Sequence, residues 1–225
     1  GYSLKKEGNT YTATYVGYGT TPAQGLPFTD VSKDSPYYDG IKFVYEKGIM
    51  KGVTSTTFEP GTAVTRGMLV TLLYRNEGSP AVTGVSFSDV AAGRYFTDAV
   101  AWAAKNGIVT GFSDGTFRPN AAVTRAQFVL MLWRMCGKPA AAKSASFADT
   151  ANGGWYQDAL NWAVENGYVN GLSDTRFGPD APITRQQATA ILFRLNGGQS
   201  GAELTLTGIY EQTFTDSGTI ASWAK

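Results

Sequence analysis

One pattern of about 60 residues occurs three times along the chain, and this repetition restricts the possible folds more than any other feature of the sequence. Each copy opens with Phe-x-Asp, continues through a glycine-rich loop and reaches a Thr-Arg pair followed by an apolar run. The marker residues are Phe28, Phe87 and Phe147 at the openings and Arg66, Arg125 and Arg185 in the Thr-Arg pairs. Both sets are spaced by 59 and then 60 residues, so insertions do not accumulate within a unit. Three homologous units are therefore expected.

Hydrophobic periodicity predicts two helices in each unit. In the second unit, apolar residues recur with helical spacing over residues 96–103 and again over residues 128–135. The first helix of each unit is expected to end at a glycine in the left-handed conformation, namely Gly48, Gly107 and Gly167. The connection between the two helices is rich in turn residues, which indicates an ordered loop. The aromatic residues expected to pin this loop are Phe58, Phe117 and Phe177.

The second helix of each unit is expected to begin at the arginine of the Thr-Arg pair. In the stretch "VTRAQF", Thr124 is a good N-cap, and Gln127 completes a capping box with it. The helix then starts at Arg125, where a cation meets the partial positive charge of the helix N-terminus, which is slightly unfavourable. Another group is therefore expected to compensate this charge. The first unit has Met68 at the glutamine position and cannot close the box.

Neither helix of such a short unit can bury its apolar stripe alone. We therefore predict a mostly α-helical fold in which three helix-loop-helix units form one three-pronged bundle with pseudo-threefold symmetry, with the Thr-Arg helices near its axis. The units are assigned to residues 27–80, 81–140 and 141–200. Residues 1–26 begin with strand-like alternation and are expected to be the tail of an upstream domain or a linker. Residues 201–225 repeat the Phe-x-Asp opening and are expected to be an incomplete fourth unit.

The composition removes several functional classes. Histidine is absent, which excludes a Ser-His-Asp triad, a Cys-His pair and a two-histidine zinc site. Nineteen Lys and Arg against eighteen Asp and Glu leave a net charge of +1, so no long-range field attracts nucleic acid or an anionic membrane. No apolar run approaches the ~20 residues that span a bilayer. The single cysteine, Cys136, excludes an intramolecular disulfide and is expected to be a buried thiol.

The segments "FSDV" and "GIVTGFSDGTFRPNAAVTRAQ", with their counterparts in the other two units, resemble the S-layer homology (SLH) family over about residues 28–198. The resemblance implies three SLH repeats of a bacterial surface-layer or cell-surface protein that is secreted, carries further domains and is held noncovalently at the cell wall. The implied ligand is a secondary cell-wall polymer attached to peptidoglycan, commonly bearing pyruvate ketals and bound in grooves between repeats. No catalytic residue, cofactor, metal ion, nucleic acid or membrane insertion is expected. The family's usual motif ends in Thr-Arg-Ala-Glu, whereas Met68, Gln127 and Gln187 occupy the glutamate position here.

The residues expected to bind this ligand are led by Arg66, Arg125 and Arg185. A pyruvate ketal carries a carboxylate, which unsatisfied N–H groups at a helix start and a bidentate guanidinium would stabilise together. The alternative is that these arginines form ion pairs with nearby carboxylates. Arg125 and Arg185 are expected to contribute more than Arg66, because the first unit lacks both the capping glutamine and the Ser-Asp loop.

Further contacts to the sugar are expected from residues that flank the helices. Tyr95 and Trp155, just before the first helix of their units, offer flat apolar faces for stacking. The loop residues expected to bond sugar hydroxyls are Ser113, Asp114, Ser173 and Asp174. The Phe-x-Asp carboxylates are expected to be structural, in Asx turns or caps, and are Asp30, Asp89 and Asp149.

Two other functional classes remain open at this point. The grooves between units could receive a peptide or a neighbouring subunit, which would make the chain a protein-protein adaptor of a surface layer. A glycan-degrading enzyme would need two carboxylates flanking the scissile bond, and the sequence singles out no such pair.

Overall fold

The computed structural model describes residues 2–7, 10–15, 25–84, 87–150 and 154–198. Each unit contributes a nine-residue helix and then an 11-residue helix, as the hydrophobic period predicts. The helices are α1 (Tyr38–Glu46), α2 (Arg66–Asn76), α3 (Thr97–Lys105), α4 (Arg125–Met135), α5 (Gln157–Glu165) and α6 (Arg185–Leu195). Before them, β1 (Tyr2–Glu7) and β2 (Thr10–Tyr15) form an antiparallel hairpin. The described part is mostly α-helical, as predicted.

Local sequence signals set both ends of the helices. The side chains of the N-cap threonines each accept a hydrogen bond from the amide three residues further on, and these are Thr65, Thr124 and Thr184. Gln127 and Gln187 complete capping boxes in α4 and α6, whereas Met68 has no side-chain acceptor to offer in α2. The first helix of every unit is followed by a glycine with positive φ, namely Gly48 (69°), Gly107 (68°) and Gly167 (69°), as predicted.

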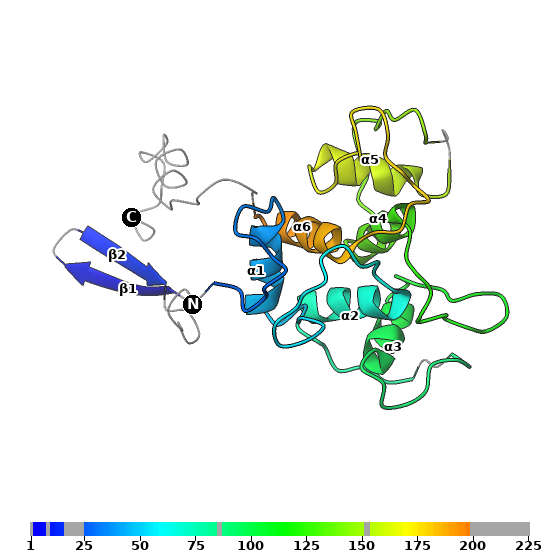
Figure 1. Cartoon of the computed structure of the whole chain (residues 1–225), viewed down its shortest axis with the longest axis horizontal. Coiled ribbons are helices and arrows are strands. Elements are labelled where there is room, and N and C mark those ends of the chain that lie inside the picture. The colour runs from blue at the N-terminus through cyan, green and yellow to red at the C-terminus, as the bar shows by residue number, and fades with distance from the viewer. Residues whose placement is uncertain (1, 8–9, 16–24, 85–86, 151–153, 199–225) are drawn as a thin grey trace.

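The helix pairs that pack together come from neighbouring units and not from one unit. As Figure 1 shows, α2 packs on α3, α4 on α5 and α1 on α6, so each of the three prongs joins helices of two units. The α1–α6 pair closes the circle between the first and third units. The two helices come close together at Gly40, where an added Cβ would lie 3.1 Å from the backbone of Ala190. Each packed pair therefore consists of the second helix of one unit and the first helix of the next, and not of the two helices of one unit.

The three units meet in a ring of backbone hydrogen bonds two residues before the second helices. The amide of Val64 donates to Ile183, that of Ile183 to Val123, and that of Val123 to Val64, each over 2.9 Å. These three residues occupy equivalent positions and are at most 1% exposed. The ring marks the pseudo-threefold axis, and the Thr-Arg helices start beside it, as the spacing predicted.

The Phe-x-Asp carboxylates clamp the long loop of their own unit. Asp30 accepts hydrogen bonds of 2.7–3.1 Å from the amides of Phe58 and Glu59. Asp89 and Asp149 make the same pair of bonds in the second and third units. The predicted structural role is confirmed, but the bonds found are long-range clamps, 28 and 29 residues apart in sequence, instead of local Asx turns.

The interior of each loop is filled by one phenylalanine. Phe58, Phe117 and Phe177 are all 0% exposed, which confirms that they pin the loops. The expectation of a buried thiol is wrong, because Cys136 is the C-cap of α4, just past its apolar stripe, and is exposed. The fourth-unit assignment of residues 201–225 lies outside the described residues.

Candidate functional site

Each Thr-Arg arginine is buried and reaches into the loop of the next unit. Arg125 is only 5% exposed, and its Nε donates to the carbonyl of Phe177 over 2.8 Å. Its guanidinium also lies over the ring of that phenylalanine, 4.7 Å from the centroid. The same two contacts join Arg66 to Phe117 and Arg185 to Phe58. A carbonyl dipole and an aromatic face thus compensate the cation at the helix start.

The amide groups at the start of these helices are already occupied. In α4 the amides of Arg125 and Ala126 donate to the carbonyls of Ala181 and Pro179 in the third unit, over 2.9 and 3.0 Å. The third amide of the helix donates to the N-cap side chain. Equivalent bonds are present in α2 and α6. The expectation that unsatisfied N–H groups at a helix start hold a carboxylate is therefore wrong, because the neighbouring unit takes these donors.

Two of the three arginines make a further backbone bond. Nη2 of Arg125 donates to the carbonyl of Asn170 over 2.7 Å, and Nη2 of Arg185 donates to the carbonyl of Lys51 over 2.9 Å. Arg185 therefore contacts the loop of the first unit, whereas Arg66 contacts the loop of the second. The Thr and Ser residues of the first loop therefore lie in the loop that Arg185 contacts. From the sequence, they were expected to affect Arg66 instead.

Arg66 has a different environment. Among the described residues its guanidinium has one carbonyl partner, Phe117, and lies 4.9 Å from the ring centroid of Phe112. Arg118 covers the same ring at 4.0 Å. Val53 and Leu172 stand at the equivalent position of the other two loops, so this aromatic contact is particular to Arg66.

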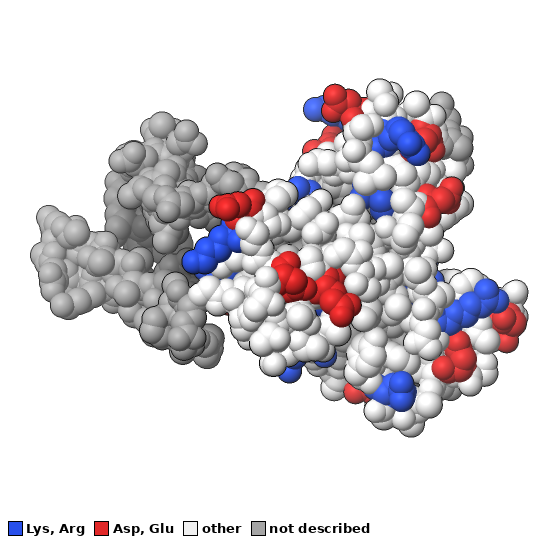
Figure 2. Space-filling model, in the orientation of Figure 1, with Lys and Arg blue, Asp and Glu red and all other residues white. Residues whose placement is uncertain are grey.

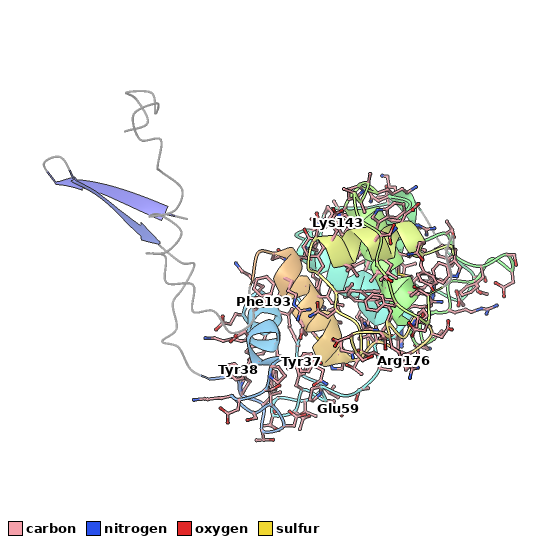
Figure 3. The ribbon with its side chains drawn as sticks, turned by 90° about the horizontal axis from the view of Figure 1, so that it is seen from above. Tyr37, Tyr38, Glu59, Lys143, Arg176 and Phe193 are labelled. Atoms are coloured by element: carbon pink, nitrogen blue, oxygen red, sulfur yellow. The ribbon has the colours of Figure 1, made fainter. Side chains whose placement is uncertain are left out.

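A groove of about 250 Å³ opens beside Arg125. It lies where three units meet, since Tyr37 precedes α1, Arg125 begins α4 and the remaining lining residues belong to the third unit. The lining residues are Tyr37, Arg125, Val169, Asn170, Gly171, Leu172, Gln187, Ala190, Ile191 and Arg194. In Figure 3, Tyr37 lies at the foot of α1, beside α6.

The chemistry of this groove combines cationic, neutral polar and apolar groups. Its charged residues are Arg125 and Arg194, and no carboxylate lines it. Burial lowers the pKa of Arg125, but an arginine remains protonated in proteins. Tyr37, Asn170 and Gln187 supply neutral hydrogen-bonding groups next to apolar side chains such as Leu172. The groove therefore suits an anionic ligand that also carries hydroxyl and apolar groups.

Of the residues expected to bind a sugar, Arg125 lines this groove and the two aromatics do not. Tyr95 and Trp155 are 59% and 60% exposed, among the most exposed large side chains in the described part. Each packs edge-on against the next aromatic, Phe96 or Tyr156. Both side chains are thus exposed and in contact with a neighbouring aromatic ring.

The loop residues lie at exposed tips. Asp114 accepts hydrogen bonds from Thr116 and pairs with Arg118 over 2.9 Å, and these contacts lower its pKa to about 2. Its carboxylate is therefore engaged within its own loop. Ser113, Ser173 and Asp174 are exposed, and none of the four loop residues lines the groove.

Apart from Arg125, the lining residues were not expected to bind a ligand, and Arg194 and Tyr37 are two of them. Arg194, in the last turn of α6, donates through Nη1 to the carbonyl of Tyr168 over 3.3 Å. The sequence carries a signal for it, since Arg75, Arg134 and Arg194 recur with the same 59- and 60-residue spacing as the Thr-Arg arginines. Tyr37 has no comparable signal, because the equivalent Phe96 and Tyr156 look like ordinary core residues.

The face drawn in Figure 2 has no large patch of a single charge. On the face shown in Figure 2, positive and negative side chains are scattered and interspersed, in keeping with the net charge of +1. In the part of the chain that the structure describes, no cluster of three or more His, Cys, Asp or Glu side chains is arranged to bind a metal. Nor does any described helix have the length and hydropathy needed to cross a bilayer.

Comparison with known proteins gives a consistent result. The sequence matches the S-layer homology domain at residues 27–67, 86–129 and 146–189, one match in each unit. It is 29% identical over 189 residues to the surface-layer 125 kDa protein of Lysinibacillus sphaericus, covering 81% of this chain and 16% of that protein. It is 29% identical over 195 residues to an amylopullulanase of Thermoanaerobacterium thermosulfurigenes, covering 83% of this chain and 10% of that protein. Identity to the cellulosome-anchoring protein of Acetivibrio thermocellus is 26% over 171 residues, covering 71% and 38%.

The chain thus spans between 10% and 38% of the length of these relatives. They share the repeat region, while one is named as an enzyme and another as an anchoring protein. The three matches, the three-pronged helical fold and the repeated Thr-Arg helices agree with one another, and the chain belongs to the S-layer homology domain family of cell-surface, cell-wall-associated modules.

Proposed function

We propose that this module anchors its parent protein to the cell wall by binding a secondary cell-wall polymer on peptidoglycan, through the carboxylates of pyruvylated sugars. The observation that carries the proposal is the groove at Arg125, which has two arginines, no carboxylate and several neutral polar groups in its lining. The module acts by binding alone, and any catalysis belongs to other parts of a parent protein.

A pyruvylated sugar matches this groove in three respects. Its carboxylate can accept charge-assisted hydrogen bonds from a guanidinium, which are about twice as strong as neutral ones. Its hydroxyl and amide groups can bond Tyr37, Asn170 and Gln187. Its ketal methyl group can pack on Leu172 or Ile191, so the groove has a partner for each part of the ligand.

The other expected residues take supporting roles in this proposal. By pseudosymmetry, Arg185 and Arg66 would each bind in a site like that of Arg125, and Arg66 contributes least because the apolar ring of Phe112 lies against its guanidinium. Tyr95 and Trp155 offer exposed stacking faces to sugars that extend beyond the grooves. The loop tips at Ser113, Asp114, Ser173 and Asp174 supply hydrogen bonds to sugar hydroxyls.

A protein-protein adaptor is the second candidate. It is favoured by the exposed apolar residues around the loops and prongs, among them Val53, Tyr95, Trp155 and Leu172. In that case a peptide or a neighbouring subunit of a surface layer would occupy the grooves, and binding would not depend on pyruvate.

Sedimentation with purified sacculi tests the proposal. The chain should bind sacculi that carry the polymer, bind poorly after the pyruvate is removed, and fail to bind after the polymer is stripped. Arg125→Lys keeps the charge but loses the planar fork, so we expect about 10- to 100-fold weaker binding, the equivalent of about 1.4–2.8 kcal/mol. Circular dichroism checks that the variant is folded.

Calorimetry separates specific from general adhesion. Titrations would use pyruvylated N-acetylmannosamine, its unpyruvylated counterpart and an unrelated acidic polysaccharide. Because the net charge is only +1, we expect binding of the first alone and a modest loss from low to physiological salt. Equal affinity for all three, or undiminished binding to stripped sacculi, would rule out the pyruvate-dependent function.

A further inference from the structure

Arg194 lines the same groove as Arg125 but comes from another unit and from the opposite end of a helix. Arg125 begins α4, whereas Arg194 lies in the last turn of α6. We propose that Arg194 is a second anion-binding residue of this groove, and that the groove holds one carboxylate between two guanidinium groups from two units. This inference rests on the proposed function and adds a specificity residue that lies outside the Thr-Arg motif.

The charges in the groove favour an anion between the two arginines. Both carry a positive charge, and no Asp or Glu is among the lining residues. The ion pairs found among the described side chains involve neither of them. Asp149, which is not a lining residue, favours the charged form of Arg125. A carboxylate bound in the groove would be attracted by both guanidinium groups, and the low local dielectric of a partly buried site strengthens that attraction.

Both arginines also have hydrogen-bond donors to spare. A guanidinium has five N–H donors. Arg125 commits two of them to the carbonyls of Phe177 and Asn170, and Arg194 commits one to the carbonyl of Tyr168. The donors that remain are sufficient for both oxygens of one carboxylate.

The same backbone bonds hold the two side chains in place before a ligand arrives. The rotamer of Arg125 is set by two carbonyls and by the ring of Phe177, and that of Arg194 by the carbonyl of Tyr168. Less side-chain entropy is therefore lost on binding than for two free surface arginines.

The arginine pairs at the equivalent positions of the repeat are Arg185 with Arg75 and Arg66 with Arg134. In α2 and α4, Thr71 and Leu130 replace the small Ala190 that lines the Arg125 groove, and Phe112 lies against Arg66. The Arg125–Arg194 pair therefore has the least bulk beside it. Arg134 also makes the same helix-end bond as Arg194, to the carbonyl of Ile108 over 3.3 Å. Arg134→Gln is thus a matched control for the structural role of this position.

The first test compares Arg194→Gln and Arg134→Gln in the whole chain. The probes are pyruvylated N-acetylmannosamine and its unpyruvylated counterpart, measured by calorimetry and by the NMR signal of the Arg125 Nε–H group. We expect Arg194→Gln to weaken binding of the acidic sugar at least 10-fold at the Arg125 groove, with the neutral sugar unaffected. Arg134→Gln should leave the Arg125 titration as in the wild type. Unchanged affinity in Arg194→Gln would overturn the inference while the anchoring function stands.

The second test needs no glycan. Leu172 lines the groove and is 51% exposed, so Leu172→Asp places a carboxylate in the groove that both arginines line, with little effect on the core. We expect this variant to raise the thermal midpoint and to weaken binding of the acidic sugar by occupying its site. The rise should disappear when Arg194→Gln is added. A rise that does not depend on Arg194 would contradict the two-arginine site. If the wild type binds no sugar but Leu172→Asp still raises the thermal midpoint in a way that requires Arg194, only the anchoring function is overturned.

Discussion

The Thr-Arg arginines show how one side chain can serve both folding and recognition. Arg125 joins the second unit to the third through two carbonyls and an aromatic ring, and still presents part of its guanidinium to a groove. Its conservative variants therefore report on binding, whereas truncation to alanine also removes contacts between units. Folding and binding have to be measured together at this position.

Alanine substitution should affect the three arginines unequally. Arg125→Ala leaves the buried carbonyl of Phe177 and the partly buried carbonyl of Asn170 without their charged donor, whereas Arg66→Ala leaves only one buried carbonyl. We expect the free energy of unfolding to fall by about 2–4 kcal/mol for Arg125→Ala and by about 1–2 kcal/mol for Arg66→Ala. Urea denaturation followed by circular dichroism measures both. An equal or larger loss for Arg66→Ala would contradict the assignment of the second carbonyl bond.

The Phe-x-Asp clamps predict how stability depends on pH. Burial raises the pKa of Asp30 and Asp149, but bonds from two backbone amides outweigh it and leave each pKa below the usual 3.8. A depressed pKa contributes stability that is present above the unfolded-state value and is lost as pH falls through the folded-state value. The chain should therefore lose stability below about pH 4.

The measurement compares the wild type with Asp30→Asn/Asp149→Asn at pH 7 and pH 3. The double variant should be less stable at pH 7, by about 1–3 kcal/mol for each clamp, because a neutral amide is a weaker acceptor. The difference between the two proteins should shrink at pH 3. Asp174→Asn serves as the control at an exposed loop tip. If the difference in stability between the wild type and the double variant is the same at both pH values, the clamp mechanism is wrong.

At the scale of single elements, the sequence predicts what depends on local contacts. The starts of α4 and α6, their capping boxes and the glycines after the first helices all follow from residues within one turn. The pairing of α1 with α6 does not, because it joins residues about 150 positions apart and depends on how three units close on themselves. The groove forms only when the first unit packs against the third. Tyr37 could therefore not be predicted as a lining residue from the sequence around it. Cys136 was predicted to be buried because it follows an apolar run. The run itself does not show at which residue the helix leaves the core, and Cys136 lies just beyond that point.

The capping boxes differ between units and can be compared directly. Gln127→Met gives α4 the residue that α2 has at this position and removes the bond from the Thr124 amide to the glutamine side chain. We expect a loss of about 0.3–1.5 kcal/mol in unfolding free energy. Gln127→Glu keeps an acceptor for that amide and should retain most of the stability. Thermal denaturation of the two variants decides between them, and similar losses in both would mean that the box contributes nothing.

The α1–α6 contact depends on a glycine. A side chain at Gly40 would meet the backbone of Ala190 at 3.1 Å, so the two helices must move apart to accept one. Gly40→Leu should destabilise the fold by about 1–3 kcal/mol through overpacking. Gly61→Ala is the control, since nothing lies within 4 Å of an added Cβ there. If calorimetry finds the two variants equally stable, the helices are not in the close contact described.

At the scale of the whole molecule, the three units are interdependent. Each prong uses helices from two units, and each Thr-Arg arginine contacts the loop of the next unit. The ring of hydrogen bonds at Val64, Val123 and Ile183 needs all three. The described trio therefore resembles a single cooperative domain more than an array of separable repeats.

Truncation tests this interdependence. A chain that ends at residue 140 keeps α1 and α4 but lacks their partners α6 and α5. We expect it to have little helical signal and no cooperative unfolding, whereas residues 25–198 should unfold in one two-state transition. Calorimetric and van't Hoff enthalpies of the longer piece should agree. Independent melting of the shorter piece at the temperature of the full trio would show that the units fold separately.

The closure between α1 and α6 has a mechanical consequence. Gly40 meets Ala190 and, three residues further on in both helices, Phe43 meets Phe193, so the helices advance in the same direction. The trio is entered beside Tyr38, at the start of α1, and left beside Phe193, at the end of α6. Tension between these two points would therefore act directly on the contacts between α1 and α6. A pull on the chain from both sides of the trio would thus act first on the α1–α6 pair, the contact between helices that are farthest apart in sequence.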